Sequence, residues 1–207
     1  VGLLLMIKVT HSQRIVMQRR RIPVLDPFFD RVSMLLWPRF KHVCDANIRS
    51  IKTATPKKLG PVDTSPHYVA RRYAELVSSV LTLHGGTDSL GVGGGGEHML
   101  MQTVQQLRIE LVALLEKLGA MLLHSKDRKV FFINNLDQIL SVFQERRIIS
   151  EEVQRFEDLL TQQRELFAEE ELRESFPRLI SFVLQTENVM SQGSSGTGTG
   201  TGKRGGG

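Results

Sequence analysis

Cysteine is almost absent from this sequence, since its 207 residues contain only Cys44. A single cysteine excludes an intrachain disulfide framework, the usual means of stabilising small secreted domains. The chain must therefore rely on a packed apolar core, and its cysteine content fits a reducing compartment.

Long hydrophobic runs and aromatic residues are also scarce. The N-terminal run VGLLLMI has seven residues, whereas a membrane-spanning helix needs about twenty. It lacks the basic flank and cleavage site of a signal peptide, so we expect it to be the cut end of a helix within a longer protein. Aromatic residues make up 6% of the chain. Because no aromatic-rich basic platform is present, we predict no nucleic-acid partner.

Charge is unevenly distributed along the chain. Residues 1–58 contain twelve Lys or Arg and three Asp, a net charge of +9, whereas residues 97–192 carry a net charge of −5. A basic N-terminal third joined to an acidic helical half predicts two surfaces with different partners.

Helical periodicity is the dominant pattern in the sequence, and no segment alternates convincingly with period two. We expect an all-α protein, an elongated antiparallel bundle or rod of about six helices. The expected organisation is a truncated helix with a basic segment (1–25), a helical pair (26–84), a flexible Gly-rich linker (85–96), a helical bundle (97–192) and a disordered tail (193–207). The Gly-rich run lacks the Gly-Lys-Ser/Thr ending of a phosphate-binding loop.

Several helices have recognisable start signals and apolar seams. Asp26, Ser65 and Ser150 are predicted N-caps, and helices are expected near residues 27–54, 66–83, 100–121, 130–147, 151–167 and 177–189. The clearest seam alternates spacings of four and three residues, as in a coiled coil. Its members are Leu100, Val104, Leu107, Leu111, Leu114, Leu118 and Met121.

The dipeptide Trp37-Pro38 interrupts an apolar pattern that otherwise continues in phase from Leu36 to Phe40. Proline in a helix interior removes one hydrogen bond and clashes with the carbonyl four residues earlier, at a cost of about 3 kcal/mol or more. Because the phase is kept across the proline, we favour a kink within one core helix over a helix end, with Trp37 packed beside the bend.

The search for reactive chemistry yields no catalytic, cofactor-binding or metal-binding candidate. The histidines are scattered without a His-x-x-x-His pair, and Cys44 has no second thiolate nearby in the sequence. The densest charge run is Arg19-Arg20-Arg21. It is either a solvated segment or an electrostatic contact for anionic lipid or an acidic partner. These arginines are the only binding candidates.

Two adjacent asparagines, Asn134 and Asn135, are unusual in a helix interior. They are either exposed on the polar face, or one is buried and fixes the helix register by hydrogen bonding, as in coiled coils.

Three blocks in this order resemble the vacuolar protein sorting-associated protein 52 family. They are RRRIPVLDPFFDRVSMLLWPRFKHV from Arg19, HYVARRYAEL from His67 and VFFINNLDQILSVFQER from Val130. The resemblance covers roughly residues 14–188. Its most specific positions are Leu36, Trp37, Pro38, Phe40, Tyr73, Asn134 and Asn135. The Gly-rich run and the Gly-Thr tail depart from the family pattern, and members of the family are longer on both sides.

The resemblance implies a non-enzymatic subunit of a vesicle-tethering complex, the Golgi-associated retrograde protein complex or a related endosomal recycling tether. It implies stacked helical bundles like those of exocyst-like tethers and no cofactor. The implied partners are vacuolar protein sorting proteins 51, 53 and 54, a Rab-type GTPase and SNARE proteins. The implied location is the cytoplasmic face of the trans-Golgi network and endosomes, where the protein would be peripheral. The alternative is a generic helical scaffold or adaptor unrelated to tethering.

Overall fold

A computed structural model describes residues 1–84 and 95–193, and within these ranges all regular structure is helical. This confirms the all-α prediction. The elements are α1 (Gly2–Arg19), η1 (Pro23–Leu25), α2 (Asp26–Lys52), η2 (Pro56–Lys58), α3 (Tyr68–His84), α4 (Gly95–Gly119), α5 (Ser125–Glu145), α6 (Glu151–Ser175) and α7 (Pro177–Gly193). The N-terminal segment, which was expected to be the end of a helix, forms α1. Together with the six helices expected after it, the described ranges hold seven α-helices.

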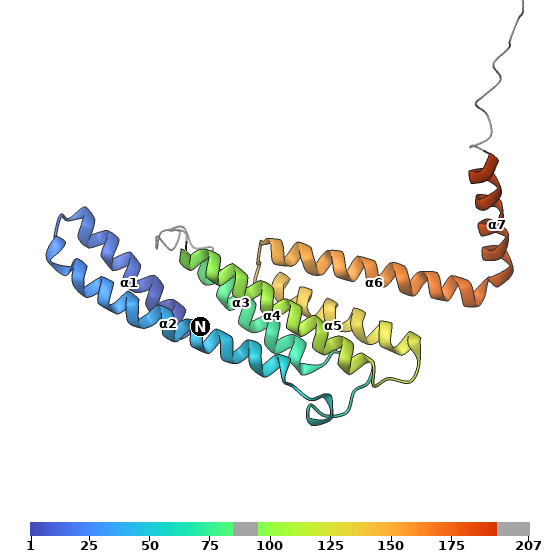
Figure 1. Cartoon of the computed structure of the whole chain (residues 1–207), viewed down its shortest axis with the longest axis horizontal. Coiled ribbons are helices and arrows are strands. Elements are labelled where there is room, and N and C mark those ends of the chain that lie inside the picture. Colours follow the sequence, from blue (N-terminus) through green and yellow to red (C-terminus); the bar gives the residue numbers. More distant parts are fainter. Residues whose placement is uncertain (85–94, 194–207) are drawn as a thin grey trace, which may run out of the picture. The chain divides into compact units, whose positions relative to one another are not determined.

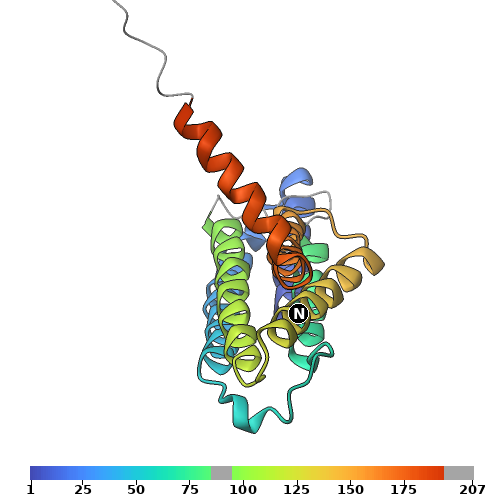
Figure 2. The ribbon, with the colours of Figure 1, turned by 90° about the vertical axis from the view of Figure 1, so that its right-hand side faces the viewer.

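The chain divides into two compact units, residues 1–164 and residues 165–207, with the boundary inside α6. In the first unit, α1 and α2 form an antiparallel hairpin joined by η1, and α4 lies beside α2 (Figures 1 and 2). α3 packs mainly against α5, and α4 also contacts α5. In the second unit, the end of α6 is followed by α7.

The first unit contains two buried apolar clusters. The larger cluster lies among α3, α4, α5 and the first half of α6, and its largest fully buried side chains are Phe131, Phe143 and Phe156. The smaller cluster joins α1, α2 and α4 and consists of Leu4, Ile7, Leu36, Phe40 and Leu100. Burial of each such large side chain contributes about 1.5–3 kcal/mol. Because α4 contributes to both clusters, it connects the α1–α2 hairpin to the rest of the unit.

The predicted heptad seam is the buried face of α4. Its first six members, Leu100 to Leu118, are all at most 4% exposed. Met121 was predicted on the same seam, and this is wrong because α4 ends at Gly119 and Met121 is 47% exposed.

Helix α2 continues through Trp37-Pro38 to Lys52 as one helix of 27 residues. The alternative in which the helix ends at Trp37 is therefore wrong. Leu36 and Phe40 are both buried on the same side, so burial of this stripe stabilises the helix across the proline.

The three predicted side-chain caps are not formed. Asp26 is the first residue of α2 and makes no capping bond; it lies 3.9 Å from Arg14 instead. α3 begins at Tyr68, and Ser65 bonds instead to the carboxylate of Asp63 in the preceding turn. Ser150 precedes α6 as predicted, but its buried hydroxyl has no hydrogen-bond partner within the described ranges.

Two other boundaries differ from the expectation. α5 begins at Ser125, five residues before the predicted start at Val130. Residues 85–94 of the predicted linker lie outside the described residues. Gly95 and Gly96, the last two residues of the predicted linker, belong to the first turn of α4. The predicted disordered tail also lies outside the described residues, apart from Gly193 at the end of α7.

Candidate functional site

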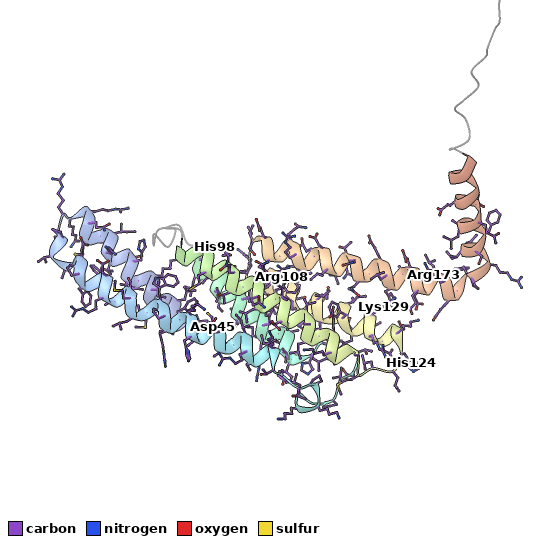
Figure 3. The ribbon with its side chains drawn as sticks, in the orientation of Figure 1. Asp45, His98, Arg108, His124, Lys129 and Arg173 are labelled. Carbon is purple, nitrogen blue, oxygen red and sulfur yellow. The ribbon has the colours of Figure 1, made fainter. Side chains whose placement is uncertain are left out.

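Metal-ligating side chains do not form a site in the part of the chain that the structure describes. No group of three or more His, Cys, Asp or Glu residues within residues 1–84 and 95–193 is arranged to hold a metal ion. His98, for example, lies near the start of α4, whereas His124 immediately precedes α5, beyond the other end of α4 (Figure 3).

Trp37 lies against the first turn of α4. A Cβ atom added at Gly96 would lie 2.6 Å from Cζ2 and 2.7 Å from Cη2 of the indole. Both distances are far below van der Waals contact, so only glycine fits beneath this ring. The indole also meets Phe40 edge to face, with ring centroids 6.0 Å apart. Trp37 thus fixes how closely α2 approaches α4.

Leu36 and Phe40, the apolar partners of Trp37 in the family block, lie in the smaller core cluster. They are 9% and 5% exposed, whereas Pro38 is on the exposed side of α2. The block therefore acts as one packing unit, and sequence reasoning missed only its glycine partner at position 96.

Asn134 and Asn135 fasten the connector between η2 and α3 to α5. Asn135 is fully buried, and its Oδ1 accepts a hydrogen bond of 2.8 Å from the backbone N–H of His67. Its Nδ2 donates to the carbonyl of Phe131 at 2.7 Å. The half-buried Asn134 donates to the carbonyl of Thr64 at 2.7 Å. The prediction that the asparagines are exposed on the polar face of the helix is therefore wrong for Asn135.

Tyr73 places a hydroxyl inside the larger core cluster. The residue is 3% exposed, its ring lies 5.7 Å from that of Phe156, and its hydroxyl has no hydrogen-bond partner within the described ranges. Burial raises the pKa of Tyr73 well above its usual value, and the charge of Glu152 adds to this while Arg108 opposes it. Tyr73 is therefore a neutral core residue.

Arg108 of α4 and Glu152 of α6 form a largely buried ion pair that sequence reasoning missed. Nε of Arg108 lies 3.1 Å from Oε2 of Glu152, and their side chains are 18% and 12% exposed. The two atoms are not aligned as a hydrogen bond. Burial raises the pKa of Glu152, and the charge of Arg108 opposes this effect. Figure 3 shows Arg108 on α4 beside the start of α6. The pair was missed because 44 positions separate its members in the sequence.

A cavity of about 760 Å³ lies beside this ion pair, among α3, α4 and the α5–α6 connection. Its lining carries both signs of charge, including Arg146, Arg155 and Glu151. Arg146 donates to the hydroxyl of Ser79 at 2.8 Å. The mixed charge gives this cavity no clear ligand preference.

The predicted binding candidates Arg19, Arg20 and Arg21 lie where α1 ends and the chain turns into η1. All three are exposed. The following segment carries exposed apolar side chains, notably Val24 at 78% and Phe28 at 59%. We call residues 19–28 the hairpin tip, since they join α1 to α2.

No helix in the described part of the chain is both long enough and apolar enough to cross a membrane.

Taken together, the described residues define an all-α helical-bundle protein whose distinctive side chains set helix packing. The family described as "Vps52, C-terminal" matches residues 1–168, and the chain belongs to this family. This confirms the resemblance found in the sequence.

Relatives bear the same family name. The chain is 39% identical over 189 residues to "Vacuolar protein sorting-associated protein 52 B" of Arabidopsis thaliana, covering 91% of this chain and 26% of that protein. It is 32% identical over 194 residues to "Vacuolar protein sorting-associated protein 52 homolog" of Homo sapiens, covering 93% of this chain and 26% of that protein. The chain thus spans about a quarter of the length of these relatives. No solved structure matches the chain.

Proposed function

We propose that this chain is part of a non-enzymatic subunit of a vesicle-tethering complex that acts in retrograde transport from endosomes to the trans-Golgi network. The observation that carries the proposal is membership of the Vps52 family over residues 1–168. The relatives' names refer to vacuolar protein sorting, which is a coarser function. The tethering role, the complex and its location are our proposal.

The proposed partners are the vacuolar protein sorting proteins 51, 53 and 54, a Rab-type GTPase and SNARE proteins. A tether acts by spanning distance and combining several weak contacts, which together give strong binding through multivalency. Packed helices with separate basic and acidic regions suit this role. In this proposal, the protein is peripheral, on the cytoplasmic face of the trans-Golgi network and endosomes.

An apolar seam in the second unit supports assembly with other helices. Leu179, Phe182 and Val183 of α7 stand at positions i, i+3 and i+4, so they share one face of this helix. They are 57%, 65% and 40% exposed. A helix with such a seam buries it by pairing with another helix, and we propose that a helix from another tether subunit supplies the pairing.

The generic-scaffold alternative attributed the resemblance to ordinary helical periodicity. Family membership removes that explanation, because a match at 39% identity over 91% of the chain rests on particular residues and not on periodicity alone. The tethering role therefore remains the better-supported function.

Affinity purification of the tagged full-length parent protein from its own cells tests the proposal. We expect the three other tether subunits to be recovered together. Leu179→Ser with Val183→Ser should reduce recovery of at least one subunit, whereas the neighbouring exposed change Arg178→Ser should leave recovery unchanged. Failure of the unaltered protein to recover any of the three subunits would overturn the proposal.

A further inference from the structure

The hairpin tip carries both positive charge and apolar side chains on its surface. Its three consecutive arginines are exposed, and four apolar side chains beside them are exposed as well. The exposed fractions are 39% for Ile22, 78% for Val24, 37% for Leu25 and 59% for Phe28. Exposed apolar side chains grouped in this way usually mark an interaction site.

The positive charge of the tip is not neutralised by the nearest carboxylates. Asp26 and Asp30 both face Arg14, at 3.9 Å and 2.7 Å from its guanidinium group. Within the described ranges, Arg19, Arg20 and Arg21 form no ion pair with any carboxylate. The tip thus presents three unpaired positive charges beside its apolar side chains.

The backbone at Arg21 is in a conformation that disfavours an arginine. Its φ angle is +57°, and Ile22 N–H donates to the carbonyl of Met17 at 3.0 Å, so Arg21 occupies the left-handed position that ends a helix. Glycine is the usual residue at this position because it has no Cβ. Arg147 occupies an equivalent position after α5, so the helix dipole accounts for some preference for arginine there. The dipole does not account for the exposure of Val24 and Phe28.

We propose that the hairpin tip docks onto the surface of anionic lipid bilayers. The three arginines contact lipid headgroups, and Val24 and Phe28 enter the interfacial layer between headgroups and acyl chains. Stable association of a protein with a membrane requires two attachment signals, because a protein held by one weak anchor dissociates readily. Basic side chains at a negatively charged surface provide the first signal, and the apolar side chains provide the second.

This inference deepens the proposed tethering function, since a tether must contact a membrane. Its biological meaning rests on that function, whereas vesicle binding by the chain does not. Its test requires the 207-residue chain and vesicles but no other subunit. Failure of vesicle binding would therefore leave the affinity purification unaffected, and failure of the purification would leave vesicle binding unaffected.

The first test is flotation of the chain with vesicles of phosphatidylcholine, with and without added phosphatidylserine. We expect binding only when phosphatidylserine is present, and weaker binding at high salt, because salt screens exposed charges. Charge reversal of Arg19, Arg20 and Arg21 to Glu should lower the partition coefficient by at least about 100-fold. The control Lys57→Glu with Lys58→Glu, in η2 beyond the other end of α2, should retain binding within about threefold, since α2, which separates these positions from the tip, is about 40 Å long.

The second test concerns the apolar side chains. Val24→Ser with Phe28→Ser should lower binding by about tenfold or more, because two apolar groups no longer enter the interface. Met34→Ser with Leu35→Ser is a matched control, since these side chains are 76% and 69% exposed on the same helix but lie outside the tip. Circular dichroism of each variant checks that the helices remain folded.

A third variant separates membrane contact from folding. Arg21→Gly should raise the urea midpoint, since glycine suits the left-handed backbone, and should lower vesicle binding by about fivefold. Equal flotation with and without phosphatidylserine would overturn the proposal. So would binding of the chain to poly-glutamate but not to anionic vesicles, which would identify an acidic protein as the partner.

Discussion

The side chain of Asn135 holds the backbone N–H of His67 at 2.8 Å, across 68 positions of sequence. The bond joins the middle of α5 to the residue immediately before α3, and both residues are buried. The same side chain also bonds to the carbonyl of Phe131 one turn earlier in α5. Asn135 thus satisfies the N–H of the residue before α3, while Nδ1 of His67 caps the helix locally by accepting from the N–H of Val69 at 3.3 Å.

We predict that Asn135→Ala destabilises the fold by about 1–3 kcal/mol, because it leaves the buried N–H of His67 without an acceptor. Urea unfolding followed by circular dichroism measures the change. The matched control is Asn134→Ala, which removes one bond from a half-buried side chain and should cost about 1 kcal/mol or less. Equal losses for the two variants would contradict the different roles assigned to them.

The contact between Trp37 and Gly96 predicts an unusual effect of alanine. In an ordinary helix interior, Gly→Ala stabilises by about 1 kcal/mol. At position 96 the added methyl would overlap the indole, so Gly96→Ala should destabilise by about 1–3 kcal/mol and shift the emission of the only tryptophan.

Gly119 of the same helix provides the control for this prediction. A Cβ at Gly119 would lie 3.5 Å from the ring of Phe131, an ordinary contact. Gly119→Ala should therefore be close to neutral and leave the emission spectrum unchanged. A stabilising Gly96→Ala would show that the indole is not held against α4.

The buried ion pair of Arg108 and Glu152 predicts strong coupling between two substitutions. Arg108→Met alone leaves a largely buried carboxylate unpaired, so we expect a loss of about 3 kcal/mol. Adding Glu152→Gln should recover part of this loss, since it removes the unpaired charge. A double-mutant cycle in urea should give a coupling energy of about 1–3 kcal/mol, whereas additive losses would argue against a direct interaction.

His67 predicts a fall in stability on mild acidification. Burial lowers the pKa of His67, and the backbone of Leu59 and the charge of Asp63 partly offset this effect. The unfolded chain then takes up the proton on His67 at a higher pH than the folded chain does. The contribution of neutral His67 to the free energy of unfolding is therefore complete above about pH 6.5. It is lost as the pH falls from there through the pKa of His67 in the folded state.

The measurement is urea unfolding at several pH values below 7, comparing the unaltered chain with His67→Asn. We expect the variant to lose part of the acid sensitivity. The raised pKa of Glu152 acts in the opposite sense, because the folded state then retains its proton to a higher pH. Glu152→Gln should therefore make the acid sensitivity of the chain steeper, and an unchanged slope in His67→Asn would contradict the role of His67.

The contrast between the seam of α4 and the helix starts shows which kinds of feature sequence reading predicts well. Leu100 to Leu118 were predicted as one buried face because a period of 3.5 residues is a property of the sequence itself. The cap predictions failed because a cap depends on competing partners. Asp26 faces Arg14 from another helix. At the start of α3, His67 rather than Ser65 accepts a backbone N–H, and Asn135, far away in the chain, holds His67 in place.

The sequence by itself determined the helical class, the apolar faces and the family, because periodicity and specific residue blocks are local properties of the chain. It also located the arginines of the hairpin tip. The tertiary structure alone decided that Gly96 lies beneath Trp37, that Asn135 bonds to His67 and that Arg108 pairs with Glu152. It also decided that Val24 and Phe28 remain exposed beside the arginines. Each of these depends on which helices meet, and that is set by the packing of the whole core rather than by any one segment.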